Sequence, residues 1–453
     1  MLDTGEEHDR HRHTRPRSAA FHRFDSAAGH FALDVESGRI HHLAAMRANT
    51  LDAILRLGDV GRAEMTALAF GIATPCAEAA APPRSVPVKA ISLAVAQSCN
   101  LGCTYCYAQQ GTFGEKEDNM APAVAKAAID QLIEAAQPGE ALTLAFMGGE
   151  PLVNRKTLHA STRYAAGKAT ARGIRIGFSM TTNATLLRDE DFALFQEYDF
   201  TLTISLDGLH ATHDRLRPYR SGSGSFEKVA KNVRALLAAD DRRYRVLARV
   251  TVTPKNLDLP EIMTGVLGMG FDAVMFSPML SAPSGKDEML APDLDRLLDQ
   301  LIRCGESFRE ALRQGRILPL SNVIKTLQRI HHYQRENYPC GAGGGYMGVA
   351  ADGGLYACHR FVNDDEGLMG DVFGGVDPDR QSSWLDRRHL EKQAPCGGCW
   401  ARYLCSGGCH YEAIKRGRPA CDYIRGWTAY CLGLYTELMH TQPDALQKIL
   451  ISH

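Results

Sequence analysis

Three cysteines that lie close together in the chain have the type and spacing for metal or redox chemistry. Cys99, Cys103 and Cys106 form a C-x3-C-x2-C sequence directly after the apolar run 90–96, which predicts a short buried strand. The thiols then lie on a loop at a strand's carboxyl end, where α/β folds hold their active sites. Three thiolates suit a four-iron cluster with one iron open to an external ligand. A structural zinc loop is the alternative, although a closed zinc site needs a fourth ligand.

This stretch resembles the signature of the radical S-adenosylmethionine (SAM) superfamily, CxxxCxxC with an aromatic residue, here Tyr105, before the third cysteine. The resemblance implies that Cys99, Cys103 and Cys106 hold a [4Fe-4S] cluster and that SAM binds the open iron. It also implies reductive cleavage of SAM to a 5′-deoxyadenosyl radical.

Three further motifs follow predicted strands and are similar to the superfamily's SAM-binding motifs. They are Gly148-Gly149-Glu150-Pro151, Thr181-Thr182-Asn183 (with Ala184 in place of the usual glycine) and Ser205-Leu206-Asp207-Gly208. Two glycines let the backbone approach a ligand closely, and a carboxylate pairs with an ammonium group. The resemblance therefore assigns SAM contacts to Tyr105, Gly148, Gly149, Glu150, Pro151, Thr182, Asn183, Ser205, Arg217 and Arg249.

Two arginines and one aspartate are singled out within this region. Arg217 and Arg249 are candidates to pair with the SAM carboxylate, because a guanidinium binds a carboxylate as a rigid fork. Structural or surface ion pairing is the alternative for both. Asp207 is the candidate catalytic residue, which would accept a proton from the substrate.

A second group of cysteines occupies residues 338–431. Its spacing resembles the SPASM domain, C-x(9–15)-G-x4-C, then C-x2-C-x5-C-x3-C, then a last cysteine. The eight thiols, which equal the ligand number for two four-iron clusters, are Cys340, Cys358, Cys396, Cys399, Cys405, Cys409, Cys421 and Cys431.

The resemblance also divides these thiols between two auxiliary [4Fe-4S] clusters. The first takes Cys340, Cys358 and Cys409, and the second takes Cys396, Cys399 and Cys405. We assign Cys421 to the second cluster. Cys431 is either a fourth ligand of the first cluster or free, and a free Cys431 would leave that cluster with an open iron. Zinc is the alternative for any CxxC pair.

The elements that must position these residues alternate from residue 90 onward. Strands are predicted near 90–96, 141–146, 174–180, 200–205, 245–253 and 272–277, and helices near 120–136, 155–171, 187–196, 225–239 and 257–268. Six strands alternating with helices predict an α/β fold with a parallel sheet and right-handed crossovers. A partial (β/α)6 barrel is the natural closure and is what the resemblance implies.

The rest of the chain divides into flanking segments. Residues 18–73 hold three short strands and two helices and resemble the winged-helix-like element that recognises leader peptides; an N-terminal domain that merely pads the barrel is the alternative. The predicted divisions are a disordered tail 1–17, this domain 18–73, a linker 74–88, the barrel 89–290, a helical bridge 291–337, the SPASM domain 338–431 and a C-terminal helix 432–453. Cys304, in the bridge, is expected to be a buried structural thiol.

Composition excludes some classes of partner. The 453 residues carry a net charge of −1, so no basic field argues for nucleic acid. No apolar run is long enough to span a membrane, and residues 1–17 lack the apolar core of a secretory signal, so we expect a cytoplasmic protein. The expected partners are a precursor peptide or small protein with a leader region, and a flavodoxin or ferredoxin-type electron donor.

Sequence details favour a peptide-modifying enzyme. The CYAxxGxxG form of residues 106–114 and the stretch 421–427 resemble maturases that install thioether bridges in ribosomally made peptides. The first hypothesis is therefore hydrogen abstraction from a peptide carbon followed by a bond to a cysteine sulfur. Alternatives are carbon–carbon or carbon–oxygen links between side chains, and formylglycine formation as in anaerobic sulfatase maturation. A non-catalytic iron–sulfur carrier or scaffold is the alternative from another class.

Overall fold

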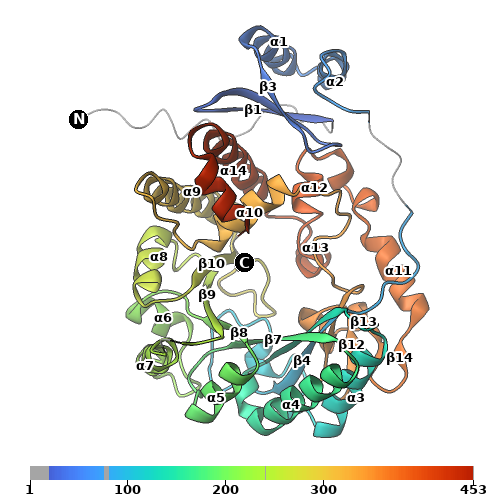
Figure 1. Ribbon diagram of the computed structural model, residues 1–453, viewed down its shortest axis with the longest axis vertical. Coiled ribbons are helices and arrows are strands. Elements are labelled where there is room, and N and C mark those ends of the chain that lie inside the picture. Colours follow the sequence, from blue (N-terminus) through green and yellow to red (C-terminus); the bar gives the residue numbers. More distant parts are fainter. Residues whose placement is uncertain (1–19, 76–80, 240, 452–453) are drawn as a thin grey trace.

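A computed structural model describes residues 20–75, 81–239 and 241–451 of the chain (Figure 1). The predicted tail 1–17 lies outside the described residues. The described chain contains one large mixed sheet, a small N-terminal sheet, and helices that cover both.

The predicted barrel strands form in the predicted order. They are β4 (Ala90–Gln97), β6 (Ala141–Gly148), β7 (Arg175–Thr182), β8 (Thr201–Ser205), β9 (Arg245–Val252) and β10 (Ala273–Pro278). Each is parallel to the next, in the order β10-β9-β8-β7-β6-β4. The intervening helices are α3 (Pro122–Glu134), α4 (Arg155–Ala171), α5 (Asp189–Glu197), α6 (His210–Leu216), α7 (Phe226–Leu237) and α8 (Leu259–Gly268). The α/β fold class with its parallel sheet is confirmed; the short helix α6 was not predicted.

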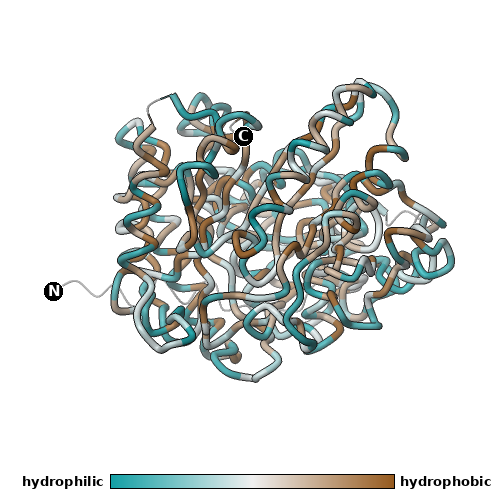
Figure 2. The backbone as a smooth tube through the Cα atoms, turned by 90° about the horizontal axis from the view of Figure 1, so that it is seen from below, coloured by the Kyte–Doolittle hydropathy of each residue, from teal (hydrophilic) through white to brown (hydrophobic). Residues whose placement is uncertain are grey.

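Alternation along the strands separates a helix-facing side from an inner side. In β9, Val246, Ala248, Val250 and Val252 are buried, whereas the residues between them are half-buried or exposed. Period-two burial of this kind places alternate side chains on opposite faces of the sheet. Apolar stretches lie mainly along the helices and strands, and hydrophilic stretches gather at the outer turns (Figure 2). Polar side chains of the inner face are therefore available to build a site.

The cysteine-rich region extends the barrel sheet, which was not predicted. Its strands β11 (Tyr346–Val349), β12 (Gly354–Tyr356), β13 (Leu368–Asp371) and β14 (Gly375–Val376) continue the sheet beyond β4. β11 lies parallel to β4, with Tyr346 opposite Ala90. A two-residue strand, β5 (Asp118–Asn119), also pairs with β4. Strands of two to four residues among many glycines carry too little periodicity to be recognised in the sequence.

Helices connect and close the C-terminal half. They are α9 (Ala291–Arg313), α10 (Ser321–His331), α11 (Pro378–Arg388), α12 (Arg402–Cys405), α13 (His410–Arg416), α14 (Cys421–Thr441) and α15 (Pro443–Ile451). Cys304 on α9 is fully buried, as expected. The expected final helix begins earlier, at Cys421, and is interrupted before Pro443, so the predicted division at 431/432 falls inside α14. Proline cannot continue a helix without losing a hydrogen bond.

The N-terminal segment forms the predicted small sheet with two helices. Strands β1 (Phe21–Ser26), β2 (Gly29–Asp34) and β3 (Ile40–Leu43) are antiparallel, and α1 (Ala45–Arg56) and α2 (Val60–Ala69) follow. In Figure 1 this unit sits above α12 and α14.

Buried polar contacts fix the N-terminal unit to the cysteine-rich region. The Glu36 carboxylate pairs with the Arg402 guanidinium, and both side chains are buried. The His22 ring stacks on Trp400 with ring centroids 3.5 Å apart. These contacts lie beside Cys399, so the N-terminal sheet is anchored next to the predicted second auxiliary cluster.

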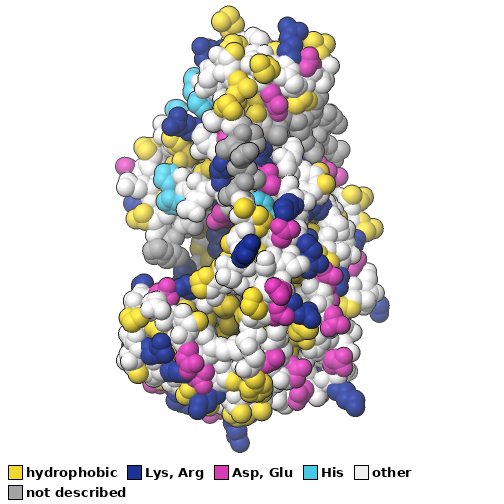
Figure 3. Space-filling model, turned by 90° about the vertical axis from the view of Figure 1, so that its right-hand side faces the viewer, with side chains coloured by type: hydrophobic (Ala, Val, Ile, Leu, Met, Phe, Trp, Pro, Cys, Tyr) yellow, Lys and Arg dark blue, Asp and Glu magenta, His cyan; other side chains and the backbone are white. Residues whose placement is uncertain are grey.

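The surface is mixed in charge. On the face shown in Figure 3, Lys and Arg side chains are interspersed with Asp and Glu. Within the described residues, none of the helices combines the length and apolar character that crossing a membrane requires.

Candidate functional site

The first cysteine loop follows β4 and is held by two neighbouring segments. The Gly102 and Thr104 amides donate to the carbonyls of Pro218 (2.8 Å) and Leu216 (3.1 Å), at the end of α6. On the other side the Asn100 side-chain amide donates to Thr185 Oγ1 at 2.8 Å. The loop is thus anchored at the carboxyl ends of the strands, as the sequence indicated.

The three thiols of this loop interact electrostatically. Burial raises the pKa of Cys103 to about 12. The Arg217 guanidinium lowers this pKa, whereas the thiols of Cys106 and Cys99 raise it further. Burial also raises the pKa of Cys99 to about 11, with contributions from Glu150 and Cys106. Each thiol therefore lies within the electrostatic range of the others, as ligands of one cluster must.

The two glycines of the Gly-Gly-Glu-Pro motif bring β6 against the cysteine loop. A Cβ on Gly148 would lie 2.3 Å from the Ala96 carbonyl oxygen, and one on Gly149 would lie 2.2 Å from that of Ser98. Gly148 also has φ of +142°, which L-residues rarely adopt. The Gly149 amide donates to the Ala96 carbonyl at 2.9 Å. In the structure these glycines serve a close backbone contact with the segment that leads to Cys99.

Glu150 joins the ends of β6 and β7. Its carboxylate is fully buried and accepts from the Thr182 hydroxyl (2.7 Å), the Asn183 amide (2.7 Å) and the Leu152 amide (3.1 Å). Burial raises its pKa, and these hydrogen bonds oppose the rise. Pro151, which follows, is buried at the start of a single 3-10 turn. Contact of Glu150 with the SAM ammonium remains a proposal.

The Thr-Thr-Asn motif contacts the cysteine loop directly. The Asn183 side-chain amide donates to Asn100 Oδ1 at 2.9 Å and approaches Cys99 Sγ at 3.8 Å. Ala184, in the position usually taken by glycine, has φ of +62° and is buried. The Asn232 side chain donates to its carbonyl at 2.7 Å. This contact helps to hold a backbone conformation that costs a non-glycine residue about 1–2 kcal/mol.

Asp207, Arg217 and Tyr105 form a buried network rather than an open catalytic group. Tyr105 donates its hydroxyl proton to Asp207, and Arg217 Nη1 lies 2.6 Å from the Tyr105 hydroxyl and 3.5 Å from Asp207 Oδ2. The other Asp207 oxygen accepts from the Thr251 amide at 2.8 Å. Asp207 is completely buried. These contacts link the buried Asp207 to the cysteine loop through Tyr105, and its role as a proton acceptor from substrate stays a prediction.

Ser205 and Arg249 lie opposite each other on β8 and β9. Ser205 is half-buried, and Arg249 is accessible to solvent. Desolvation by surrounding protein lowers the pKa of Arg249, and the charge of Arg360 lowers it further, whereas Tyr107, Cys409 and Tyr105 oppose the shift.

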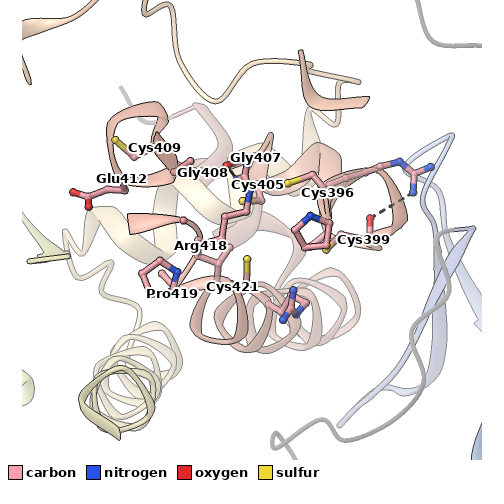
Figure 4. A pocket seen from close by; sticks show the side chains of 18 of the residues that line it. Cys396, Cys399, Cys405, Gly407, Gly408, Cys409, Glu412, Arg418, Pro419 and Cys421 are labelled. Atoms are coloured by element: carbon pink, nitrogen blue, oxygen red, sulfur yellow. Dashed lines mark hydrogen bonds between the residues drawn. The ribbon is translucent and has the colours of Figure 1, made fainter. Parts of the chain in front are cut away.

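Five cysteines, Cys396, Cys399, Cys405, Cys409 and Cys421, line one cavity in the C-terminal region. Figure 4 shows the Cys421 thiol rising from α14 toward those of Cys396, Cys399 and Cys405, with Arg418 between them. Burial raises the pKa of Cys405 to about 11, and the thiols of Cys399, Cys421 and Cys396 contribute. The cavity, of about 70 Å³, exceeds the space of one water molecule several times over.

The remaining cysteines separate into a second set and one outlier. Burial raises the pKa of Cys358 to about 12, with contributions from the thiols of Cys409 and Cys340. The Cys409 thiol points away from the first cavity's centre in Figure 4. Cys431 is fully buried on α14, where its thiol interacts with the Thr326 side chain. The structure thus places Cys431 apart from both sets.

The donor sets fit iron–sulfur clusters. The thiols form three groups, of three, three and four members, whose members interact electrostatically, and thiolates are the ligands such clusters use. Among the described residues, His, Cys, Asp and Glu side chains nowhere gather in threes at the close range of a single metal ion. A four-iron cluster distributes its ligands over several irons, so its thiolates need not meet at one metal ion.

Sequence reasoning missed several residues of the site's interior. Arg360 pairs with Glu412, donates to the Ser281 carbonyl at 3.0 Å and lies over the Tyr107 ring, 5.1 Å from its centroid. The His359 ring packs edge-on against Tyr107. The only sequence signal for Arg360 and His359 was their position directly after Cys358. Through their contacts with Tyr107, the first auxiliary set meets the first cysteine loop.

Comparisons with known proteins agree with this arrangement. Residues 93–263 match the radical SAM superfamily. The chain is 26% identical over 367 residues to the serine-type anaerobic sulfatase-maturating enzyme of Klebsiella pneumoniae, which covers 76% of this chain and 88% of that enzyme.

Two solved structures share the fold. Native anSMEcpe with bound AdoMet superposes with a TM-score of 0.63 at 18% identity, covering 79% of this chain and 100% of that one. Streptococcus suis SuiB bound to its precursor peptide SuiA superposes with a TM-score of 0.52 at 14% identity, covering 90% and 98%.

Proposed function

The chain is a radical SAM enzyme of the SPASM type, and from this premise we propose that it modifies a ribosomally made peptide or small protein by forming an intrapeptide thioether. The observation that carries the proposal is the separation of the thiols into one group on the barrel loop and two further groups in the C-terminal region. An enzyme that only cleaves SAM has no need of the second and third groups.

The residues that would hold the cofactors follow from the site. Cys99, Cys103 and Cys106 would hold the SAM-binding cluster. The first auxiliary cluster would be held by Cys340, Cys358 and Cys409, and the second by Cys396, Cys399, Cys405 and Cys421. When bound, SAM and its cluster would supply the radical that removes a hydrogen atom, and the auxiliary clusters would accept the electron that remains.

The chain's own residues would prepare the site for this chemistry. The glycines at 148 and 149 hold β6 against the cysteine loop, and Tyr105 fixes that loop to the buried Asp207–Arg217 pair. The loop is thus held from two sides, which keeps the reacting positions fixed relative to the strand ends. Arg217 also lies within electrostatic range of Cys99 and Glu150, beside the expected position of SAM.

Substrate recognition would use the N-terminal sheet. Its outer strand β3 pairs with β2 on one side, so its other edge suits an added strand from a leader peptide. A small electron-transfer protein, of flavodoxin or ferredoxin type, would supply the electron for SAM cleavage.

The test uses anaerobically reconstituted enzyme, SAM, dithionite and a short peptide encoded beside this gene. We expect 5′-deoxyadenosine, loss of two hydrogens from the peptide, and one cysteine that no longer reacts with iodoacetamide. Loss of two hydrogens with every thiol still reactive would refute the thioether. Absence of 5′-deoxyadenosine under dithionite would refute the radical mechanism itself.

Formylglycine formation is the second candidate, favoured by the similarity to a sulfatase-maturating enzyme. It predicts an aldehyde on the product that reacts with a hydrazine, whereas a thioether product has none. The same reaction mixture therefore distinguishes the two.

A further inference from the structure

Arg249 is a charged side chain that the site as described does not use. It lies on β9 between the buried Ala248 and Val250, so its side chain is on the inner face of the sheet. Neither a hydrogen bond nor an ion pair joins its guanidinium to another side chain in the described part of the chain. A guanidinium has five N–H donors and stays charged, so it is suited to bind an anion.

The surroundings of Arg249 differ from those of Arg217. Arg217 is buried, paired with Asp207, and acts on Cys99, Cys103 and Glu150, the residues around the expected SAM position. Arg249 lies within electrostatic range of Tyr107 and Tyr105 on the cysteine loop, and of Arg360 and Cys409 on the side of the first auxiliary set. Arg217 is thus tied to the expected SAM position, whereas Arg249 has neighbours on both the cysteine loop and the first auxiliary set.

Arg360, the other arginine on this side of the site, has its charge compensated by a carboxylate. Arg360 is paired with Glu412 and lies over the rings of Tyr107 and Tyr411. Among the described residues, no carboxylate pairs with Arg249 as Glu412 pairs with Arg360. Because Arg249 is accessible to solvent, a ligand can reach it.

We propose that Arg249 is a substrate-binding residue that pairs with a carboxylate of the peptide, between the SAM-binding loop and the first auxiliary set. The inference rests on the proposed function in requiring a peptide substrate. It names the class of peptide: one that carries an acidic side chain, or its C-terminal carboxylate, next to the residue to be modified. A charge-assisted hydrogen bond of this kind favours an acidic peptide over its amide by about 10- to 100-fold.

The test measures protection of Arg249 from phenylglyoxal in anaerobically reconstituted, SAM-bound wild-type enzyme, located by mass spectrometry after digestion. The probes are the tripeptides Ac-Ala-Asp-Ala-NH2, Ac-Ala-Asn-Ala-NH2, Ac-Ala-Ala-Ala-OH and Ac-Ala-Ala-Ala-NH2 at millimolar concentration. Arg245, which is exposed four residues earlier on the same strand, is the internal control.

We expect the acidic probes to slow modification of Arg249 and to leave Arg245 unaffected, and the two amide probes to protect neither. Protection by the aspartyl probe identifies a side-chain carboxylate as the ligand, and protection by the free acid identifies the peptide C-terminus. Equal effects of acidic and amide probes, including none, overturn the proposal. Protection of Arg249 by SAM alone, relative to SAM-free enzyme, overturns it by assigning Arg249 to the cofactor carboxylate.

A matched pair of variants adds a second readout. Arg249→Gln should abolish the preference for acidic probes, measured by equilibrium dialysis of labelled tripeptides, and Arg245→Gln should keep it. An Arg249→Gln enzyme that retains the preference, or that changes only the reduction potential of a cluster, contradicts a substrate role. None of these measurements requires turnover, so they stand apart from the test of the proposed function.

Discussion

The two cysteines of α14 should respond oppositely to replacement. Cys421 lies at the first position of the helix and Cys431 ten residues later. At 1.5 Å per residue the two are about 15 Å apart along the helix axis, and 100° per residue turns them onto different faces. One iron–sulfur cluster therefore cannot bind both. We expect Cys421→Ala to lower the iron content and Cys431→Ala to leave it unchanged.

The expected loss of iron follows from the number of thiol groups. Three four-iron clusters correspond to about twelve irons per chain, and loss of the second auxiliary cluster leaves about eight. Cys431→Ala should instead destabilise the fold, by about 1–2 kcal/mol, because it leaves a cavity in the core. Cys304→Ala is the matched control, since Cys304 is also fully buried and burial alone raises its pKa.

The assay is iron and sulfide analysis of each anaerobically reconstituted variant, with a Mössbauer spectrum to identify the cluster type. About eight irons in Cys431→Ala would refute the reasoning, because a buried thiol beside Thr326 would then be a ligand. About twelve irons in Cys421→Ala would refute it equally, unless the Mössbauer spectrum shows one cluster with a non-thiolate ligand at one iron.

Three further outcomes are expected. Gly149→Ala should cost about four irons of the barrel cluster, because its Cβ would meet the Ser98 carbonyl, whereas Gly167→Ala on α4 meets nothing and should retain every iron; equal iron contents would contradict this. Asp207→Asn should lower the free energy of unfolding by about 3–5 kcal/mol in anaerobic urea titration, since it leaves the buried Arg217 charge uncompensated; an unchanged midpoint would rule out the pairing. Glu36→Gln should loosen the N-terminal sheet and hasten its release by trypsin with no change in iron content, and resistance equal to wild type would contradict the anchoring role.

Local patterns predicted the barrel well. The six strands were recognisable because runs of apolar residues alternated with helical periodicity over short distances, and each signal needed no information from elsewhere in the chain. The motif cysteines were recognisable for the same reason, since their spacing is a property of one loop.

Pairings between distant segments could not be predicted. Nothing in the residues around Tyr346 indicates that they pair with β4, and the partner of a buried arginine such as Arg217 is not encoded in its neighbours. Asp207 illustrates the limit: its motif suggested a proton acceptor, whereas its burial and its contact with Tyr105 suit a positioning role. The direction of the Cys431 side chain depended on the phase of a helix that starts at Cys421, whereas the predicted C-terminal helix was 432–453.

The pairing of β11 with β4 has a consequence for how the protein is made. Tyr346 lies opposite Ala90, so 256 residues must be synthesised after Ala90 before β11 can pair with β4. Until then β4 is paired only with β6 and, at Ala96 and Gln97, with the two-residue strand β5, so most of one edge of an apolar strand is unpaired and is a template for aggregation. Chains interrupted before β11 should therefore depend on chaperones. Iron loading of the first cysteine loop, which follows β4 directly, is best timed after translation is complete.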